Sequence, residues 1–251
     1  MRIANRAGGY SFLKGISPYS AGVVATPGFE ILHVRFSGLL PLDRGFAAIE
    51  SYLKVQGRPH QALCAVELRS PRPFTFQGFQ NFNQRYVDIL DGWGLLLEGA
   101  NPVARTNVAP HLLAPAEPSI DGFSLTVAAE NAPHSFVIAG AGELPEGSLD
   151  LHDVIRRGET SEAALREKVR FVIGLMSARL AGLEVGWKQV TSAQVYTVHD
   201  IHPFLEREIL SGMREAASLG IHWHYARPPI ESIEYEMDLR GCRREAILEV
   251  S

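Results

Sequence analysis

Residues 68–74, Leu-Arg-Ser-Pro-Arg-Pro-Phe, and residues 196–204, Tyr-Thr-Val-His-Asp-Ile-His-Pro-Phe, share one local pattern. Each stretch ends an apolar, strand-like run and leads through a Pro-Phe pair into a run with helical spacing. The same order of elements recurs on both sides of residue 130, which indicates that a unit of about 120 residues occurs twice. We therefore predict two tandem domains, residues 1–129 and 130–251.

The runs around these two stretches predict similar elements in each half. Alternating apolar and polar residues predict strands, and apolar residues three or four apart predict helices. The expected strands are residues 29–36, 61–68, 101–110, 122–129, 135–139, 190–198, 222–226 and 233–239, and the expected helices are residues 45–53, 76–90, 161–183 and 204–213. The order predicts an α+β fold in which each domain is a mixed β-sheet backed by two helices.

The composition is typical of a soluble globular protein. The 251 residues carry a net charge of −4, so there is no basic excess that would favour nucleic acid. No apolar run reaches the roughly 20 residues that span a bilayer, and the N-terminus lacks the hydrophobic stretch of a signal peptide. Cys64 and Cys242 are isolated, which favours free thiols in a reducing compartment. We predict a cytoplasmic protein that binds neither nucleic acid nor membrane.

Arg105 lies in residues 101–110, Asn-Pro-Val-Ala-Arg-Thr-Asn-Val-Ala-Pro, a run of mostly small or apolar residues. A guanidinium is a rigid fork of donors that suits a carboxylate or phosphate. Burying it costs free energy unless it has a partner. The segment alone leaves three roles open for Arg105: an internal ion pair, a solvent-facing position, or ligand binding.

Four motifs, in the right order, resemble those of the reactive-intermediate deaminase (Rid/YjgF) family, and the resemblance covers the chain as two tandem copies. The motifs are residues 17–20 (Ser-Pro-Tyr-Ser), 36–41 (Phe-Ser-Gly-Leu-Leu-Pro), 82–86 (Phe-Asn-Gln-Arg-Tyr) and 103–106 (Val-Ala-Arg-Thr). The resemblance implies a chorismate-mutase-like fold for each copy and a homotrimer with ligand clefts between subunits. It also implies hydrolysis of enamine or imine carboxylates without a metal or other cofactor.

The resemblance also implies roles for single residues. Arg105 would bind the substrate carboxylate during catalysis. Tyr19 and Ser37 would polarise the pocket together with the backbone amide of Gly38, and Asn83 would line the cleft.

The two halves depart from the family pattern in complementary ways. The family's deaminases carry a glutamate on the last strand that helps to hold the reacting water. In the first half this position falls near Ser124, whereas the second half has Glu234 there and has Gly220 in place of the arginine. We predict one site per chain, with Ser124 among its binding residues and Glu234 among its catalytic ones. Glu234 and Glu236 share a strand face. Two interpretations stay open for this pair, a water-binding carboxylate in a cleft and a solvated strand edge, and the second is slightly favoured.

His222 and His224 lie two residues apart, so a strand would place both rings on one face. This spacing suits a metal ion or a proton relay. The sequence fixes no third ligand, and we predict no metal site.

These observations predict a hydrolytic deaminase of small enamine or imine carboxylates, of the 2-aminoacrylate or 2-aminomuconate type, that releases ammonia. Catabolism of aromatic amines would generate such compounds. Two alternatives stay open: a chorismatase-like or other hydrolase on the same scaffold, and a non-catalytic protein that binds small carboxylates.

Overall fold

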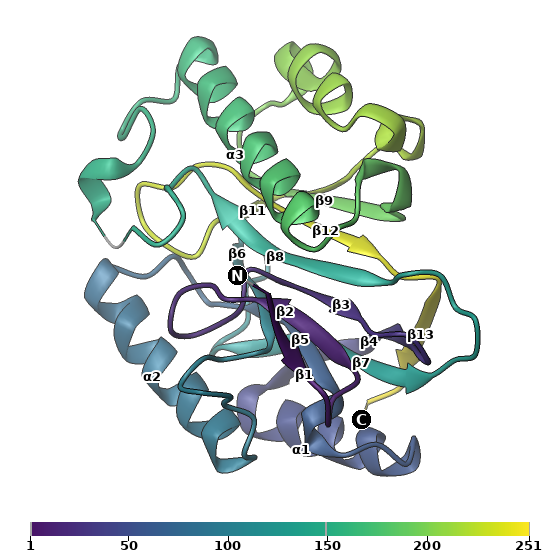
Figure 1. Cartoon of the computed structure of the whole chain (residues 1–251). Coiled ribbons are helices and arrows are strands. Elements are labelled where there is room, and N and C mark those ends of the chain that lie inside the picture. Colours follow the sequence, from purple (N-terminus) through teal and green to yellow (C-terminus); the bar gives the residue numbers. More distant parts are fainter. Residues whose placement is uncertain (1, 149, 251) are drawn as a thin grey trace.

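The protein consists of two packed β-sheets with helices on their outer faces, as the computed structural model of residues 2–148 and 150–250 shows (Figure 1). Apolar side chains from both sheets, such as Phe12, Val23, Ile31 and Ala104, form a core between them. Each sheet also has an apolar core on its outer face, between the sheet and the helices that cover it. The order of layers is therefore helix, sheet, sheet, helix.

The first sheet has seven strands and draws on both ends of the chain. Its order is β1 (Arg2–Asn5), β2 (Tyr10–Leu13), β3 (Gly22–Ala25), β8 (Phe136–Gly142), β12 (Glu236–Gly241), β9 (Ser192–Tyr196) and β10 (His222–His224). Neighbouring strands are antiparallel except β9 and β10, which are parallel.

The second sheet has six strands and also mixes the two halves. Its order is β11 (Ala226–Arg227), β6 (Ala104–Pro110), β5 (Leu63–Arg69), β7 (Ser119–Ala128), β4 (Phe29–Pro41) and β13 (Arg244–Leu248). The β5–β6 and β4–β13 pairs are parallel, and the other pairs are antiparallel.

In the described part of the chain, three α-helices cover the outer faces of the sheets. α1 (Leu42–Val55) and α2 (Phe76–Gly92) pack on the six-stranded sheet, and α3 (Glu162–Gly182) packs on the seven-stranded sheet. Short helical segments complete the molecule: 3-10 turns at His60–Ala62, Leu151–Asp153, Trp187–Gln189, His202–Phe204 and Arg214–Leu219, and a π-helix at Leu205–Leu210.

Local sequence explains where α2 and α3 begin. The Thr75 hydroxyl accepts a hydrogen bond from the backbone N–H of Gly78 at 3.1 Å, and the Ser161 hydroxyl accepts one from Ala164 at 3.3 Å. Both are N-caps, which satisfy a backbone donor that the first helical turn leaves unpaired. The helices predicted at residues 76–90 and 161–183 are thus confirmed within two residues at each end.

The predicted fold class, two Rid-like domains each with its own sheet and two helices, was wrong. The sheets have seven and six strands, and each takes strands from both halves of the sequence. β1, β2 and β3 join the sheet of the second half, while β13 at the other end of the chain pairs with β4. The domain boundary at residue 130 stays a prediction.

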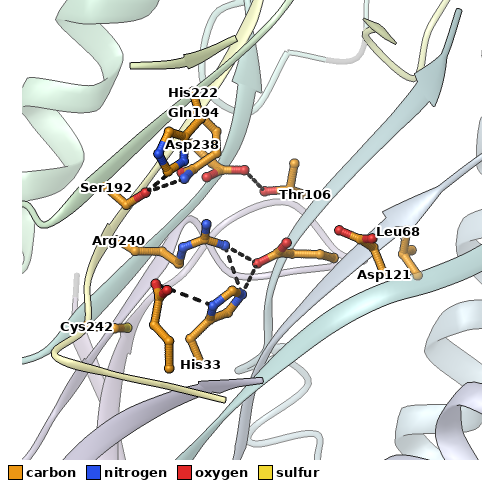
Figure 2. A network of polar contacts seen from close by, with 12 residues as sticks. His33, Leu68, Thr106, Asp121, Ser192, Gln194, His222, Asp238, Arg240 and Cys242 are labelled. Carbon is orange, nitrogen blue, oxygen red and sulfur yellow. Dashed lines mark hydrogen bonds and ion pairs between the residues drawn. The ribbon is translucent and has the colours of Figure 1, made fainter. Parts of the chain in front are cut away.

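A network of charged side chains connects the two sheets (Figure 2). His33 Nε2 on β4 lies 2.9 Å from Arg240 Nη1 on β12 and 2.8 Å from Glu67 Oε1 on β5. Arg240 Nη1 also pairs with Glu67. Nearby, the Thr106 hydroxyl on β6 donates to Asp238 Oδ2 on β12 at 2.8 Å. Buried charges of opposite sign thus face one another across the layer between the sheets.

In the part of the chain that the structure describes, no helix combines the length and apolar character needed to cross a membrane.

Candidate functional site

A cavity of about 270 Å³ lies beside Arg105. Its wall comes from the loop between β2 and β3, from α2 and from β6 on one side. On the other side it comes from the end of β8 and the loop that follows, from α3 and from the start of β12. Figure 1 shows α2 and α3 on opposite sides of the molecule with β6 and β8 between them. The cavity is therefore shared by the two sheet layers.

Arg105 is 3% exposed and has an unpaired donor. Its Nη2 donates to Asn83 Oδ1 on α2 at 2.8 Å, whereas its Nη1 has no hydrogen-bond partner within residues 2–148 and 150–250. Burial lowers the pKa of Arg105. Because a buried cation with an open donor is unfavourable unless an anion completes it, the arrangement suits a carboxylate ligand.

Aromatic rings surround the Arg105 guanidinium and fix its position. Its carbon Cζ lies 4.5 Å from the ring centre of Tyr19 and 4.9 Å from that of Tyr86. Phe79 and Phe82 follow at 5.5 and 5.7 Å. Such cation–π contacts stabilise the charge without using its hydrogen bonds. Loss of hydration raises the pKa of the Tyr19 hydroxyl, so Tyr19 enters the cavity as a neutral donor.

Glu236 contributes a buried carboxyl group to the cavity. It begins β12, opposite Gly142 of β8, and is 4% exposed. Burial raises its pKa well above the ordinary value, as does the nearby Asp238 charge, while Arg105 and Arg179 act in the opposite direction. Such a group holds its proton at pH values where an exposed glutamate is ionised. It can therefore act as an acid.

A glycine makes room for this carboxyl group. A Cβ atom added to Gly140 on β8 would collide with Glu236 Oε1. The absence of a side chain at this position therefore allows Glu236 to lie against β8.

A second arginine, Arg179 of α3, lines the cavity and is already paired. Its Nε and Nη2 donate to the Glu146 carboxylate at 3.0 and 2.8 Å, and its Nη1 donates to the Ala139 carbonyl at 2.8 Å. The Glu146 side chain is 44% exposed, so the pair is open to solvent on one side.

Asn107 provides another unpaired donor. It follows Arg105 by two residues on β6, so both side chains lie on the same face of the strand. Asn107 is 3% exposed, and its Oδ1 accepts from the Ser70 hydroxyl at 2.9 Å. Its Nδ2 has no partner in the structure.

The remaining predicted residues lie away from this cavity. Ser37 and Gly38 are exposed on β4, where the Ser37 hydroxyl accepts from the backbone N–H of Val250 at 3.0 Å. Ser124 is buried on β7, opposite His33 of β4. The structure thus brings together Arg105, Tyr19 and Asn83, and places Ser37, Gly38 and Ser124 elsewhere.

Glu234 also lies outside the Arg105 cavity. Its Oε2 is 2.7 Å from His199 Nε2, and this contact lowers its pKa. It lines a second hollow together with Arg227. The predicted strand 233–239 would place Glu234 and Glu236 on one face, but β12 begins only at Glu236, so the alternation does not extend to Glu234.

His222 and His224 lie on β10, away from the cavity. The His224 ring stacks on the Tyr196 ring, with 4.8 Å between the ring centres, and burial lowers the pKa of His224 to about 4. Among the described residues, no three metal-binding side chains of the His, Cys, Asp or Glu type gather at one point.

Glu236, Asn107 and Arg179 are among the cavity residues that the sequence did not predict as site residues. A signal for Asn107 was present, because it follows Arg105 by two residues in an expected strand. The sequence also marked Glu236 as a neighbour of Glu234. Arg179 had no local signal, since only the packing of α3 against β8 brings it to the cavity.

The sequence matches the family of the 2-aminomuconate deaminase CnbZ over residues 2–246. The chain belongs to the CnbZ family. A 2-amino-5-chloromuconate deaminase from Comamonas testosteroni is 45% identical over 244 residues, which cover 96% of each chain. The predicted membership of the Rid/YjgF family was therefore wrong.

This CnbZ-family chain also has a likeness among solved structures. A crystal structure of a chorismatase aligns with a TM-score of 0.45 and 11% sequence identity, over 95% of this chain and 78% of that one. We draw no conclusion about activity from a likeness at this level.

Proposed function

We propose that this chain is a hydrolytic deaminase of 2-aminomuconate-like enamine carboxylates, and that the reaction takes place in the Arg105 cavity. Family membership and the 45% identical deaminase support the reaction type. The observation that carries the assignment to this cavity is the buried Arg105 with its open Nη1 donor, beside the buried Glu236, whose pKa is raised.

The proposed reaction needs one water molecule and proton transfers. The enamine takes a proton on carbon and becomes an iminium. Water adds to the carbon that bears nitrogen, and the adduct loses a proton. Proton transfer to nitrogen then allows the C–N bond to break while the hydroxyl group gives up its proton, which yields a 2-keto acid and ammonia. Because the iminium carbon is electrophilic, the protein mainly has to orient the carboxylate and supply a proton relay.

Glu236 is the side chain suited to that relay. In its protonated form it donates to the enamine carbon, and the resulting carboxylate then accepts a proton from the attacking water. Arg105 holds the substrate carboxylate, and Asn83 holds Arg105. Tyr19 offers a neutral hydroxyl to the leaving nitrogen. Ser37, Gly38, Ser124 and Glu234 have no part in this proposal.

The test is ammonia release from 2-aminomuconate by the purified protein, followed together with the loss of the conjugated enamine absorbance. We expect Arg105→Met to lower kcat/KM by roughly tenfold to a hundredfold, because a charged group loses its hydrogen-bonded partner. Arg85→Met on the exposed face of α2 is the matched control and should behave as the unaltered protein.

Circular dichroism shows whether the variants remain folded. Failure of the unaltered protein to release ammonia would refute the proposed activity. Unchanged kinetics in Arg105→Met would place the reaction elsewhere.

A further inference from the structure

Two unpaired donors point to a ligand with two acceptor groups. Arg105 Nη1 and Asn107 Nδ2 are both buried without a hydrogen-bond partner among the residues that the structure describes, and both residues line the same cavity. An unsatisfied buried donor costs free energy, so native structures contain few of them. Two in one cavity indicate that a bound molecule completes both.

Separate neighbours hold the two donors. Asn83 of α2 binds the Arg105 guanidinium, and Tyr19 and Tyr86 stack on it. Ser70, which follows the end of β5, binds Asn107 instead. Residues two apart on a strand are separated by roughly 6.6 Å along its axis. The donors are therefore fixed at separate positions along β6.

The Ser70 contact sets which end of the Asn107 amide faces the cavity. The Ser70 hydroxyl donates to Oδ1, so the NH2 group is the end that remains open. An open NH2 group can only donate, and its ligand must present an acceptor such as a carboxylate oxygen.

The cavity wall is otherwise rich in apolar side chains. Phe79 of α2 faces it from one side, and Ile230 and Ile233, in the segment before β12, close it from the other. An apolar wall beside two polar anchors matches a hydrocarbon chain with a polar group at each end.

We propose that Asn107 binds the distal carboxylate of a dicarboxylate substrate, and so makes the site selective for dicarboxylates over monocarboxylates. Arg105 binds the carboxylate next to the reacting carbon. Ser70 is a positioning residue, because it orients the Asn107 amide. The identity of the reacting end rests on the proposed function, but the binding of two carboxylates does not.

Calorimetric titration with two unreactive probes tests this directly. Muconate has two carboxylates, and 2,4-hexadienoate of the same double-bond geometry has a methyl group in place of one of them. We expect Asn107→Leu to weaken muconate binding by roughly tenfold to a hundredfold, the loss of a hydrogen bond to a charged group. Its affinity for 2,4-hexadienoate should not change.

Three further variants make the comparison specific. Arg105→Met should weaken the binding of both probes, and Asn81→Leu on the exposed face of α2 should affect neither. Ser70→Ala/Asn107→Leu removes both partners of a buried hydrogen bond, which is nearly neutral for folding. It should reproduce the selective loss if Asn107→Leu alone folds poorly.

The outcomes separate this inference from the proposed function. Equal weakening of both probes by Asn107→Leu would mean that Asn107 and Arg105 hold the same carboxylate, and would overturn the inference. Unchanged muconate binding would overturn it too. Selective loss of muconate binding in a protein that releases no ammonia would uphold the inference while refuting the proposed activity.

Discussion

Glu236 shows how burial can change the chemistry of one side chain. Its carboxyl group lies beside Arg105 and Arg179, yet its pKa is raised, because burial and the Asp238 charge outweigh both arginines. Glu234, two residues earlier, contacts His199 and has a lowered pKa. The pKa values of two glutamates in one short segment are thus shifted in opposite directions, and the raised pKa makes Glu236 the better suited of the two to donate a proton.

For Glu236→Gln we expect kcat to fall by roughly a hundredfold to ten-thousandfold, the usual contribution of a general acid or base. KM should change much less, because Gln keeps the shape of the side chain. Steady-state kinetics measure both constants. Gly140→Ala should also lower kcat, since its methyl group would displace the Glu236 carboxylate. A Glu236→Gln enzyme with full activity would exclude Glu236 from the proton relay.

The same variant should change how stability depends on pH. The folded state holds the Glu236 proton above the pH at which the unfolded chain releases it, so the free energy of unfolding falls as pH rises through that window. Gln does not titrate. In urea denaturation from about pH 5 to about pH 8, the variant should therefore gain stability relative to the unaltered protein. A constant difference would contradict the raised pKa.

At the scale of elements, side chains alternate along β6, so one face of the strand lines the cavity and the other contacts the seven-stranded sheet. Arg105 and Asn107 point toward α2 and the cavity, whereas Thr106 between them points to Asp238 in the other sheet. α2 supplies Asn83 and Tyr86 to the same guanidinium. The position of Arg105 therefore depends on α2 as much as on its own strand.

Thr75→Ala should lower the free energy of unfolding by about 1 kcal/mol, because the first turn of α2 loses its N-cap. For a chain of this length the melting temperature should fall by roughly 2–4 °C. Thermal denaturation checks both this variant and Thr75→Ser, whose hydroxyl should preserve the cap. An equal loss of stability in Thr75→Ala and Thr75→Ser would show that the methyl group of Thr75 stabilises the protein and that the hydrogen bond of its hydroxyl does not.

At the scale of the molecule, the two halves are joined by sheets that contain strands from both of them and by an ionic network between the sheets. β13 pairs with β4, and β3 pairs with β8, so each sheet contains strands from both halves of the chain. Glu67 on β5 and Arg240 on β12 connect the sheets through their side chains. The predicted homotrimer stays a prediction that sedimentation would test.

Arg240→Met should destabilise the protein by about 3–5 kcal/mol, because it leaves the Glu67 carboxylate buried without its main cation. The double variant Arg240→Met/Glu67→Leu should lose less, since the Glu67 carboxylate is no longer left without its main cation. Urea denaturation at neutral pH measures both. A double variant less stable than the single one would show that the pair itself contributes net stability.

The sequence by itself determined the elements that local patterns encode. The caps Thr75 and Ser161 and the apolar spacing that follows each one set α2 and α3. Arg105, a charged residue in a run of small and apolar ones, marked the strand that lines the cavity. These features depend on residues a few positions apart, where periodicity and capping act.

Tertiary structure alone decided the pairing of strands and the rest of the site. β3 beside β8, and β13 beside β4, are contacts between distant segments that no local pattern specifies. The raised pKa of Glu236 and the position of Arg179 in the cavity wall both result from that packing. Burial and charge proximity are properties of the folded chain, so the sequence could name Arg105 but not the groups that surround it.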